Sequence, residues 1–553
     1  MTDRVGLAKA MERISGRSII AGRSVQTERG ALAFRAQDPK TGRDVERSYQ
    51  SATDSEVDEA CEQAWDAFHE MCAGAVEERA RLLERIASNI TDLGSALIEV
   101  GSKETGLSAT RLRAERDRTT STLALFARTA AEGSWVRPSI DKGDSARRPF
   151  PKADIRSMLR PLGPVAVFGS CAFPLASSSA GGDVASALAA GCPVVVKGHP
   201  MHPGMGELAA RAVADAVKDL GLHPGTYSFL HAGGSREHEV GSRLVVHPSI
   251  RAVGFTGSTR GGMALASLAH DGRDDPIPVF AQMGSTNPVF VLPGAIEKDA
   301  ERVGQRLAGS LTNSGGQMCT CPGLIFVVRS DASERLARAM ATSLREKMPA
   351  AMLGGRIADE YSARLKKVSG VTGVSVRGGS VPNGKAARDG GAHPAIGAPC
   401  LLTTKLRTFI HTPTLHAETF GPAAIIVECD RIDDLEDGAS AVLGALTGSV
   451  WFARGEDAMV RRLVDILERR VGRIVFNGAP TGVEVCPSMV HGGPYPSALP
   501  SNATGVGPLA IERWARRVCY QDAPEGALPP ELQDANPLKI RRLVDGRVEV
   551  DAI

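Results

Sequence analysis

A glycine-rich stretch near the middle of the chain presents a thiol in a setting that suits nucleophilic chemistry. Residues 313–323 read Asn-Ser-Gly-Gly-Gln-Met-Cys-Thr-Cys-Pro-Gly and include Cys319. A helical pattern precedes the stretch and an apolar run, 324–328, follows it, so Cys319 should lie on a loop between a helix and a strand. Gly315 and Gly316 would let the backbone approach a ligand closely. A thiol on such a loop is a candidate nucleophile, although a lone cysteine is more often an inert core residue.

Strands and helices alternate on both sides of this loop, which predicts an α/β fold with doubly wound sheets. Ligands of such sheets bind at the carboxyl ends of the strands. The expected strands are 165–169, 193–197, 227–230, 250–255, 289–292, 324–328 and 473–476. The expected helices are 177–190, 206–220, 237–244, 332–347, 358–368 and 456–469.

Three helices are expected before this alternation, at 55–68, 80–100 and 108–131. The third carries arginines at 111, 113, 116 and 118. Four arginines so close together usually form a solvated face, and the alternative is that one of them faces a substrate carboxylate. The stretch 135–155 has few structure signals, so we expect it to cross between domains.

Length and composition limit the classes of protein to which the chain can belong. A chain of 553 residues exceeds one ordinary core and predicts two or three domains. The net charge is +2 and no basic patch is interleaved with aromatics, which argues against nucleic acid as a partner. Residues 1–15 lack an apolar signal core, and no run of 18 apolar residues predicts a membrane span. The ten cysteines contain no Cys-x-x-Cys pair, so we expect no metal site and a reduced, cytoplasmic chain.

Several stretches together resemble one family. Gly-Gln-Met-Cys-Thr at 316–320 is similar to the nucleophile loop of the aldehyde dehydrogenases. Further matching stretches are 161–169, 187–197, 254–258, 284–288 and 418–422. Stretches 480–485, 491–496 and 536–538 are closest to the branch that contains 2-oxoglutarate semialdehyde dehydrogenases and NADP-dependent fatty aldehyde dehydrogenases.

The resemblance implies an aldehyde dehydrogenase fold with three parts. A Rossmann-like dinucleotide-binding domain would comprise residues 1–134 and 158–287, and an α/β catalytic domain residues 288–488. An oligomerisation element would comprise residues 135–157 and 489–553. The family forms oligomers, so a homodimer or homotetramer is implied.

The resemblance also implies which residues bind the dinucleotide. Gly257, Ser258 and Gly262 would meet the pyrophosphate where a strand gives way to a helix, because free N–H groups there suit an anion. Lys197 would hold the adenosine ribose. NAD-preferring relatives often have an acid three residues after this lysine, and here that position is Pro200, so a 2′-phosphate would meet less repulsion. His199 could favour NADP further, with NAD as the alternative.

In the same resemblance, Glu418 and Phe420 of Glu-Thr-Phe-Gly-Pro stand where the family grips the nicotinamide ribose. The implied chemistry is attack by Cys319 on an aldehyde or acyl thioester carbon, with hydride transfer to or from the dinucleotide. Two positions depart from the family pattern. Ala172 replaces the asparagine that stabilises the oxyanion, and Gln282 replaces the glutamate that activates water. Alanine cannot donate a side-chain hydrogen bond, and glutamine cannot accept a proton at neutral pH.

Three interpretations of these departures stay open. Other residues such as Ser170, Thr320 or Cys321 could repair the site. The thioester could pass to an acceptor other than water, or the protein could be a silent homologue kept for binding or assembly. If the family's reaction survives, we expect Ala172→Asn and Gln282→Glu to accelerate it, and we expect Cys319 to have a lowered pKa and to be the most reactive thiol.

Overall fold

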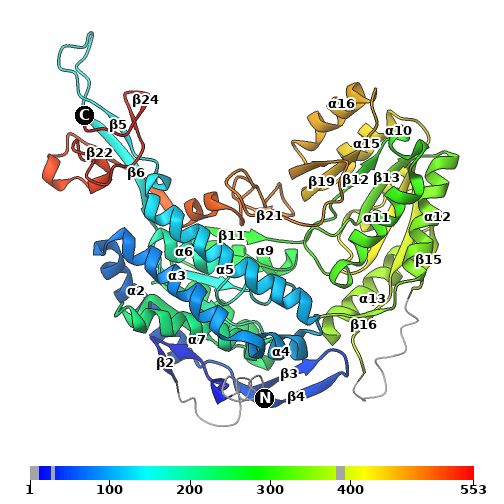
Figure 1. The fold of residues 1–553 in the computed structure, drawn as a ribbon, viewed down its shortest axis with the longest axis horizontal. Helices are drawn as coiled ribbons and strands as arrows, with labels where there is room; N and C mark the ends of the chain where they lie inside the picture. Colours follow the sequence, from blue (N-terminus) through cyan, green and yellow to red (C-terminus); the bar gives the residue numbers. More distant parts are fainter. Residues whose placement is uncertain (1–11, 26–31, 382–392) are drawn as a thin grey trace.

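The structure, a computed structural model, describes residues 12–25, 32–381 and 393–553. Within these residues two large sheets, each covered by helices, lie side by side, and a smaller sheet projects from the first (Figure 1). Residues 1–11, on which the predicted lack of a signal core partly depends, lie outside the described residues. No helix of the described part is long and apolar enough to cross a membrane.

The first sheet is built from strands early in the chain and has the order β2-β1-β9-β8-β7-β10-β11-β21. Neighbours from β9 to β11 run parallel. Its strands are β1 (Ile19–Ile20), β2 (Arg23–Ser24), β7 (Val165–Phe168), β8 (Val194–Lys197), β9 (Tyr227–Leu230), β10 (Ala252–Thr256), β11 (Val279–Gln282) and β21 (Ala498–Leu499).

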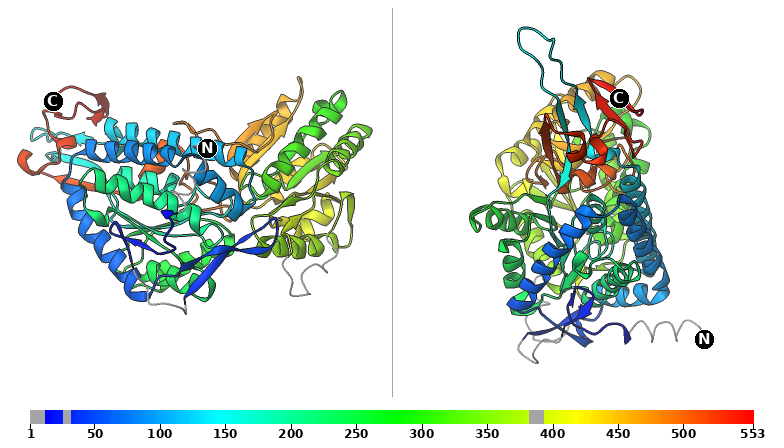
Figure 2. Two further views of the ribbon diagram at one scale, coloured as in Figure 1. Left: turned by 60° about the horizontal axis from the view of Figure 1, so that its bottom comes forward. Right: turned by 90° about the vertical axis from the view of Figure 1, so that its left-hand side faces the viewer.

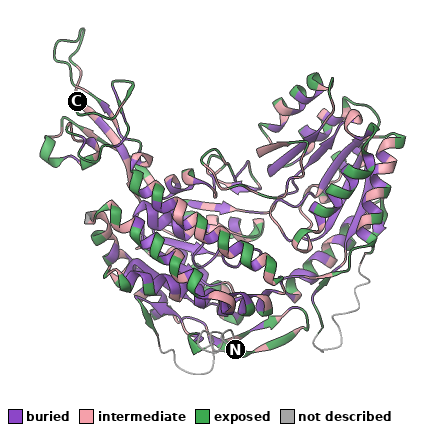
Figure 3. Ribbon diagram, viewed as in Figure 1, coloured by how far each residue is buried: buried purple, intermediate pink, exposed green. Residues whose placement is uncertain are grey.

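Helices cover both faces of this sheet because alternate strand residues point to opposite sides. Val165 and Val167 pack with α3 (Val76–Asp92), α5 (Ala109–Glu132), α6 (Gly182–Ala190) and α7 (Pro203–Asp219). Ala166 and Phe168 pack with α2 (Asp54–Ala73), α8 (Glu237–Val246) and α9 (Thr259–Asp271) on the other side. The central strands β7, β8 and β9 are buried throughout, whereas the outer helix faces are exposed (Figure 3). The helix α4 (Gly94–Thr105) and the hairpin of β3 (Ala33–Asp38) and β4 (Arg43–Gln50) complete this part.

The second sheet has the order β15-β17-β18-β13-β12-β19-β20 and is parallel except at β15. Its strands are β12 (Val289–Val291), β13 (Leu324–Val328), β15 (Val374–Gly379), β17 (Cys400–Lys405), β18 (Ala423–Cys429), β19 (Ala445–Trp451) and β20 (Val471–Phe476). Helices α11 (Ala300–Thr312) and α12 (Asp331–Arg345) pack on one face. The other face carries α13 (Gly355–Ser369), α15 (Asp434–Ala441) and α16 (Asp457–Leu467).

Residues 135–155, which have few structure signals in the sequence, contribute strands to the third sheet. This stretch contains β5 (Ser139–Asp141) and the start of β6 (Ile155–Pro161). Both join β22 (Ala515–Gln521), β23 (Arg542–Val544) and β24 (Arg547–Glu549) in the order β22-β6-β5-β23-β24. The sheet projects from one end of the molecule in Figure 1 and in the left view of Figure 2, and it faces the viewer in the right view of Figure 2. Because its partner strands come from the far end of the chain, no local pattern in 135–155 could reveal the pairing.

Most expected elements are present within a few residues, but the helix expected at 80–100 is divided into α3 and α4, and another helix is clearly shorter than expected. The helix expected at 177–190 begins only at Gly182. The chain turns before α6, where the backbone of Gly181 is extended. This turn requires glycine, because a Cβ at 181 would lie 2.3 Å from the Ala176 carbonyl oxygen. Residues 498–499 pair with β11, so part of the segment assigned to the oligomerisation element lies in the first sheet. The domain boundaries themselves stay a prediction.

Candidate active site

The nucleophile loop is held from both sides by hydrogen bonds. Helix α11 ends at Thr312, and a short helical turn, Asn313–Gly316, leads into the loop. The side-chain amide of Asn287 donates to the carbonyl oxygens of Cys319 and Cys321, each at 2.9 Å. The backbone N–H of Leu353 donates to Gln317 Oε1 at 2.8 Å. These contacts fix the backbone on which Cys319 is presented.

Gly316 permits the closest approach of the loop to the second sheet. It has a φ of +70°, and a Cβ at this position would lie 2.3 Å from the backbone nitrogen of Pro422. Any other residue would push the nucleophile loop away from the segment that carries Glu418. The structure thus requires glycine at 316 for a contact within the protein, and the predicted close approach to a ligand stays a prediction.

Cys319 is half-buried and opens into a cavity of about 130 Å³. The wall comes from helix α5, from the carboxyl ends of β10 and β11, from the nucleophile loop and from residues 482–507. Side chains important for the argument below are Arg118, Phe173, Phe255, Gln282, Thr320 and His491.

The closest polar partner of the thiol is a histidine that the sequence analysis did not single out. The Nε2 atom of His491 lies 3.3 Å from Cys319 Sγ. The backbone N–H of His491 donates to Thr504 Oγ1 at 2.9 Å, and its carbonyl oxygen accepts a hydrogen bond from Gln282 Nε2 at 2.7 Å. In the sequence, His491 only marked a stretch typical of one branch of the family, because 172 residues separate it from Cys319.

Burial keeps this pair uncharged. It raises the pKa of the Cys319 thiol to about 11, and Glu418 adds to the increase. It lowers the pKa of His491 to about 3, and the positive charges of Arg473 and Arg118 add to the decrease. The prediction of a lowered pKa at Cys319 is therefore wrong for the protein without ligands, because desolvation outweighs any effect of the loop. In addition, His491 Nδ1 is buried without a hydrogen-bond partner in the described part of the chain.

Gln282 lines the cavity and uses its amide as a donor. It ends β11, and its Nε2 atom binds the carbonyl oxygen of His491. A glutamate in the same place would set a carboxylate against that carbonyl oxygen and could not donate unless protonated. The structure therefore gives Gln282 a contact that the family's usual glutamate could not make when ionised.

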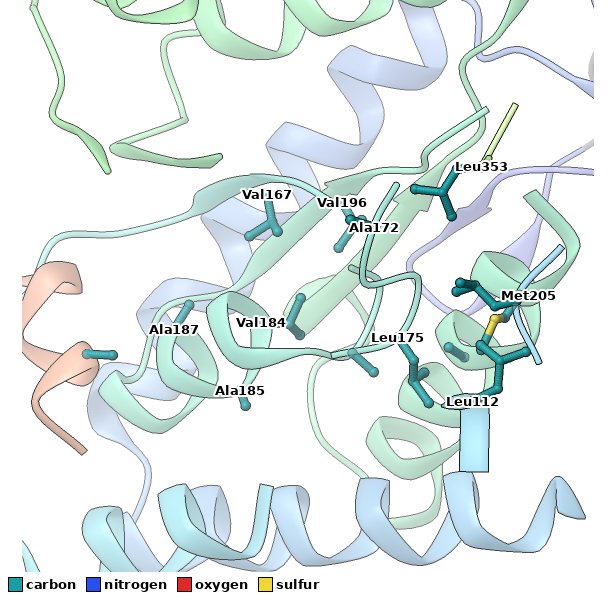
Figure 4. Close-up of a cluster of buried hydrophobic side chains, with 14 of the residues drawn as sticks. Leu112, Val167, Ala172, Leu175, Val184, Ala185, Ala187, Val196, Met205 and Leu353 are labelled. Carbon is teal, nitrogen blue, oxygen red and sulfur yellow. The ribbon is translucent and has the colours of Figure 1, made fainter. Parts of the chain in front are cut away.

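Ala172 does not line the cavity. It is 8% exposed and lies in the main hydrophobic cluster, beside Val196 and Leu353 (Figure 4). Its backbone N–H donates to Ser170 Oγ at 3.1 Å. An asparagine in this orientation would bury an amide among apolar side chains, which costs roughly 1–3 kcal/mol without a partner. The expectation that Ala172→Asn supplies an oxyanion donor has no support from this geometry.

The three residues considered as repairs differ in their placement. Thr320 lines the cavity, next to Cys319. Ser170 is 5% exposed and its hydroxyl accepts from the Ala172 N–H, so it faces its own turn. The Cys321 thiol is buried and donates to the Leu311 carbonyl oxygen at 3.6 Å, on the side of α11. Of the three, only Thr320 shares the cavity with the thiol.

On the dinucleotide side, Lys197 ends β8 and stands in an ionic group. Its Nζ atom is 3.9 Å from Glu237 Oε1, and Arg356 Nη1 is 3.9 Å from Glu237 Oε2. His199 stacks on His202 with ring centroids 5.2 Å apart. Burial, together with His202, Lys197 and Arg356, holds the pKa of His199 well below its usual value, so this ring is neutral at pH 7. His199 therefore adds no positive charge for a 2′-phosphate.

The predicted pyrophosphate loop has the expected local structure. Ser258 caps α9, with its hydroxyl accepting from the Gly261 N–H at 3.1 Å. Gly262 faces the sheet, where a Cβ would lie 2.6 Å from Met283 Sδ. Gly257 is covered by the ring of Phe255, which a Cβ would approach to 2.6 Å. A helix N-terminus with these small residues suits a phosphate group.

Glu418 and Phe420 lie on the opposite side of the nucleophile loop. Burial raises the pKa of Glu418 to about 7, and a hydrogen bond from the Ser285 backbone opposes the increase. A Cβ on Gly284 would lie 2.5 Å from Glu418 Oε2, so this glycine makes room for the carboxylate. Phe420 is half-buried against the main hydrophobic cluster. The assignment of Glu418 and Phe420 to the nicotinamide ribose stays a prediction.

Comparison with known proteins decides the family. The model of the "Aldehyde dehydrogenase family" matches residues 26–504. The chain belongs to the aldehyde dehydrogenase family. It is 42% identical to alpha-ketoglutaric semialdehyde dehydrogenase 2 of Azospirillum brasilense, over 97% of this chain and all of that protein. It is 40% identical to an alpha-ketoglutaric semialdehyde dehydrogenase of Acinetobacter baylyi, over 90% and 92% of the two chains.

Solved structures of aldehyde dehydrogenases and related enzymes share the fold. Apo betaine aldehyde dehydrogenase of Staphylococcus aureus superposes with a TM-score of 0.75 at 20% identity, covering 93% of this chain and 98% of that one. A 1-pyrroline-5-carboxylate dehydrogenase of Thermus thermophilus gives a TM-score of 0.75 at 20% identity, with coverage of 94% and 96%. The predicted aldehyde dehydrogenase fold is confirmed.

As an aldehyde dehydrogenase, the protein is an oxidoreductase that acts on an aldehyde carbon with a nicotinamide dinucleotide as its redox partner. No group of metal-ligating side chains occurs among residues 12–25, 32–381 and 393–553.

Proposed function

We propose that this aldehyde dehydrogenase attacks its substrate with Cys319 and uses His491, in place of the usual glutamate, as the proton acceptor. The observation that carries the proposal is the 3.3 Å separation of Cys319 Sγ and His491 Nε2 at the wall of one cavity. A nucleophile within hydrogen-bond distance of an acceptor is the arrangement that nucleophilic catalysis requires.

The raised pKa of Cys319 and the lowered pKa of His491 define how the first step proceeds. Both groups rest neutral, so a free thiolate is scarce. The proton of Sγ passes to Nε2 while the bond from sulfur to the aldehyde carbon forms, which avoids a separate ionisation. The neighbouring Thr320 hydroxyl and the loop backbone offer donors to the developing oxyanion.

The second half of the reaction uses the same base. Lys197, Ser258 and Glu418 would hold the dinucleotide, which would supply a hydride acceptor and so allow an acyl group to form on Cys319. His491 first releases the Sγ proton to solvent. It then takes a proton from water, whose oxygen attacks the thioester carbon, and returns this proton to the leaving sulfur, which releases the carboxylic acid and restores the Cys319 thiol. Gln282 holds the carbonyl oxygen of His491 throughout and acts as a positioning residue.

We propose NADP as the dinucleotide, with NAD as the alternative. Lys197 and Arg356 contribute two positive charges near the expected adenosine ribose, and Glu237 contributes one negative charge between them. The group therefore carries a net positive charge, which favours a 2′-phosphate. Pro200 adds no carboxylate.

For the substrate we propose a short semialdehyde. The two relatives described above, which are 42% and 40% identical to this chain, are named for alpha-ketoglutaric semialdehyde. The cavity of about 130 Å³ is small beside the roughly 300–1,000 Å³ of typical ligand sites, which argues against a long aliphatic aldehyde.

We also propose a cytoplasmic homodimer or homotetramer. The support is the projecting third sheet, whose outer strands β22 and β24 have free edges in the described chain. Apolar side chains such as Val548, which is 70% exposed, lie on it. A partner subunit would cover this surface.

Intact-mass spectrometry during turnover tests the mechanism. The protein is mixed with 5-oxopentanoate and NADP, quenched at short times and compared with Cys319→Ser and with Cys519→Ser, which changes an exposed thiol in β22. We expect NADPH and an acyl mass on Cys319 in the native protein and in Cys519→Ser, and neither in Cys319→Ser. If no member of an aldehyde panel yields NADPH or an adduct, the protein is instead a homologue with lost or repurposed catalysis.

A further inference from the structure

Arg118 is the one charged group of the cavity wall that lacks a carboxylate partner. The other charged residues that line the cavity, Asp183 and Arg513, pair with each other at 2.7 Å. His491 is neutral, as argued above. The wall therefore carries a net positive charge that comes from Arg118, on helix α5.

The acidic residues near Arg118 do not neutralise it. Glu115, one turn earlier on α5, is buried and pairs with Arg111 at 2.6 Å. Its other oxygen accepts the backbone N–H groups of Leu175 and Ala176, both at 2.9 Å. Glu484 is exposed to solvent. No carboxylate of the described residues lies within salt-bridge distance of Arg118.

The guanidinium is held in place but keeps donors to spare. Arg118 Nη1 donates to the carbonyl oxygen of Val483 at 2.6 Å. Its Nε and Nη2 atoms form no hydrogen bond with the described residues, and the side chain is only half-exposed. A planar guanidinium with free donors matches the two oxygens of a carboxylate.

A second arginine raises the positive potential without competing for the ligand. Arg473 lies close enough to Cys319 and His491 to affect the pKa of each. Its donors are occupied by Thr447 Oγ1 and by the carbonyl oxygens of Gly482 and Pro480. Arg473 therefore holds the turn at 480–482 in place, and its positive charge acts on the cavity without a free donor for the ligand.

From this arrangement we propose that Arg118 binds the distal carboxylate of the substrate, so that the cavity selects short ω-carboxy aldehydes over neutral aldehydes of equal length. The inference rests on the proposed function, because it assumes that the aldehyde carbon lies at Cys319. It also assigns a role to one of the four arginines of α5, for which the sequence left a solvated surface and a contact with a substrate carboxylate as alternatives.

The test compares 5-oxopentanoate with pentanal in the native protein and in Arg118→Gln. We expect the native protein to favour 5-oxopentanoate, and Arg118→Gln to lower its kcat/KM about 10- to 100-fold, mainly through KM. The kcat/KM for pentanal should stay within about twofold, and Arg118→Lys should recover part of the loss. Arg113→Gln, on the exposed side of the same helix, is the matched control and should change neither substrate.

Several outcomes would overturn the assignment. One is an equal loss for both substrates in Arg118→Gln, which would indicate a structural role. Another is a native protein without preference for the carboxylate. If no aldehyde is oxidised at all, the proposed function fails, and calorimetry with glutarate and its neutral analogue glutaramide decides about Arg118 separately. Glutarate binding that disappears in Arg118→Gln supports the carboxylate site, whereas binding unchanged in that variant, or absent from the native protein, contradicts it.

Discussion

The dinucleotide side and the reacting side of this site differ in how closely they follow the family. On the dinucleotide side, Lys197, Ser258 and Glu418 keep the residue types that the family uses, and their local structure suits them. On the reacting side, the oxyanion asparagine and the glutamate base are replaced, and a histidine stands 3.3 Å from the thiol. Under the proposed function, the dinucleotide site follows the family pattern, whereas proton transfer depends on a different residue, His491.

Gln282 and His491 on the reacting side are connected in the structure. Gln282 can donate to the carbonyl oxygen of His491 because it is no longer a carboxylate. His491 in turn reaches Cys319 from the segment that follows the second sheet. The loss of one base and the positioning of another are therefore linked by a single hydrogen bond.

Removal of the histidine should give the largest effect and would break the comparison most directly. We expect His491→Gln to lower kcat about 10²- to 10⁴-fold, because it removes the proton acceptor for the thiol and for water. Steady-state NADPH formation gives kcat, and fluorescence titration should show unchanged dinucleotide binding. His270→Gln, on the surface of α9, is the control. If His491→Gln keeps a kcat within threefold of the native value, His491 is not the base and another residue must accept the proton.

Thiol reactivity in the ligand-free protein tests the electrostatics of the reacting side. A pKa raised from 9.0 to about 11 leaves Cys319 protonated at pH 8, so iodoacetamide should label it about 100-fold more slowly than in the chain unfolded by guanidinium chloride. The rate should rise about tenfold per pH unit between pH 7 and 10. Peptide mapping after brief alkylation measures it, with the exposed Cys519 as the internal reference. Rapid labelling that levels off near pH 7 would show a stable thiolate and contradict the neutral pair.

Gln282→Glu tests whether residue 282 positions His491 or whether a carboxylate at this position can act as the base. We expect it to lower kcat about tenfold, as does Gln282→Ala, because both remove the donor to His491 and the first adds repulsion. The Kd for NADP should stay unchanged, and the pH profile of kcat distinguishes misplacement of His491 from general destabilisation. Acceleration by Gln282→Glu alone would favour the family's usual mechanism and remove the positioning role.

The smallest expected effect concerns the affinity of the dinucleotide side for NADP relative to NAD. Glu237→Gln removes the negative charge between Lys197 and Arg356, so it should raise the affinity for NADP relative to NAD about two- to fivefold. Calorimetric titration with each dinucleotide measures the ratio. The matched control is Glu239→Gln. Glu239 lies on the same helix as Glu237, and its carboxylate pairs with Arg236. A ratio that moves toward NAD would rule out a phosphate at this group.

Local patterns in the sequence carried much of the fold and part of the site. The apolar runs at 165–168, 194–197 and 324–328 are strands because they are buried on both faces, and their composition alone reveals this. The loop with Cys319 could be recognised for a similar reason, since its glycines and its flanking elements are neighbours along the chain. Local patterns could not reveal the third sheet, because β6 pairs with β22, which lies more than 350 residues later, and only the family resemblance grouped the two segments in one element.

What the sequence by itself determined is the chemistry available at each position: a thiol at 319, no amide at 172 and no carboxylate at 282. Only the tertiary structure decided which of these groups meet. Packing of residues 482–507 against the two sheets brings His491 to the thiol and its carbonyl oxygen to Gln282, while Ala172 turns into the core. Such contacts depend on the relative placement of elements far apart in the chain, and residue type and spacing do not encode that placement locally.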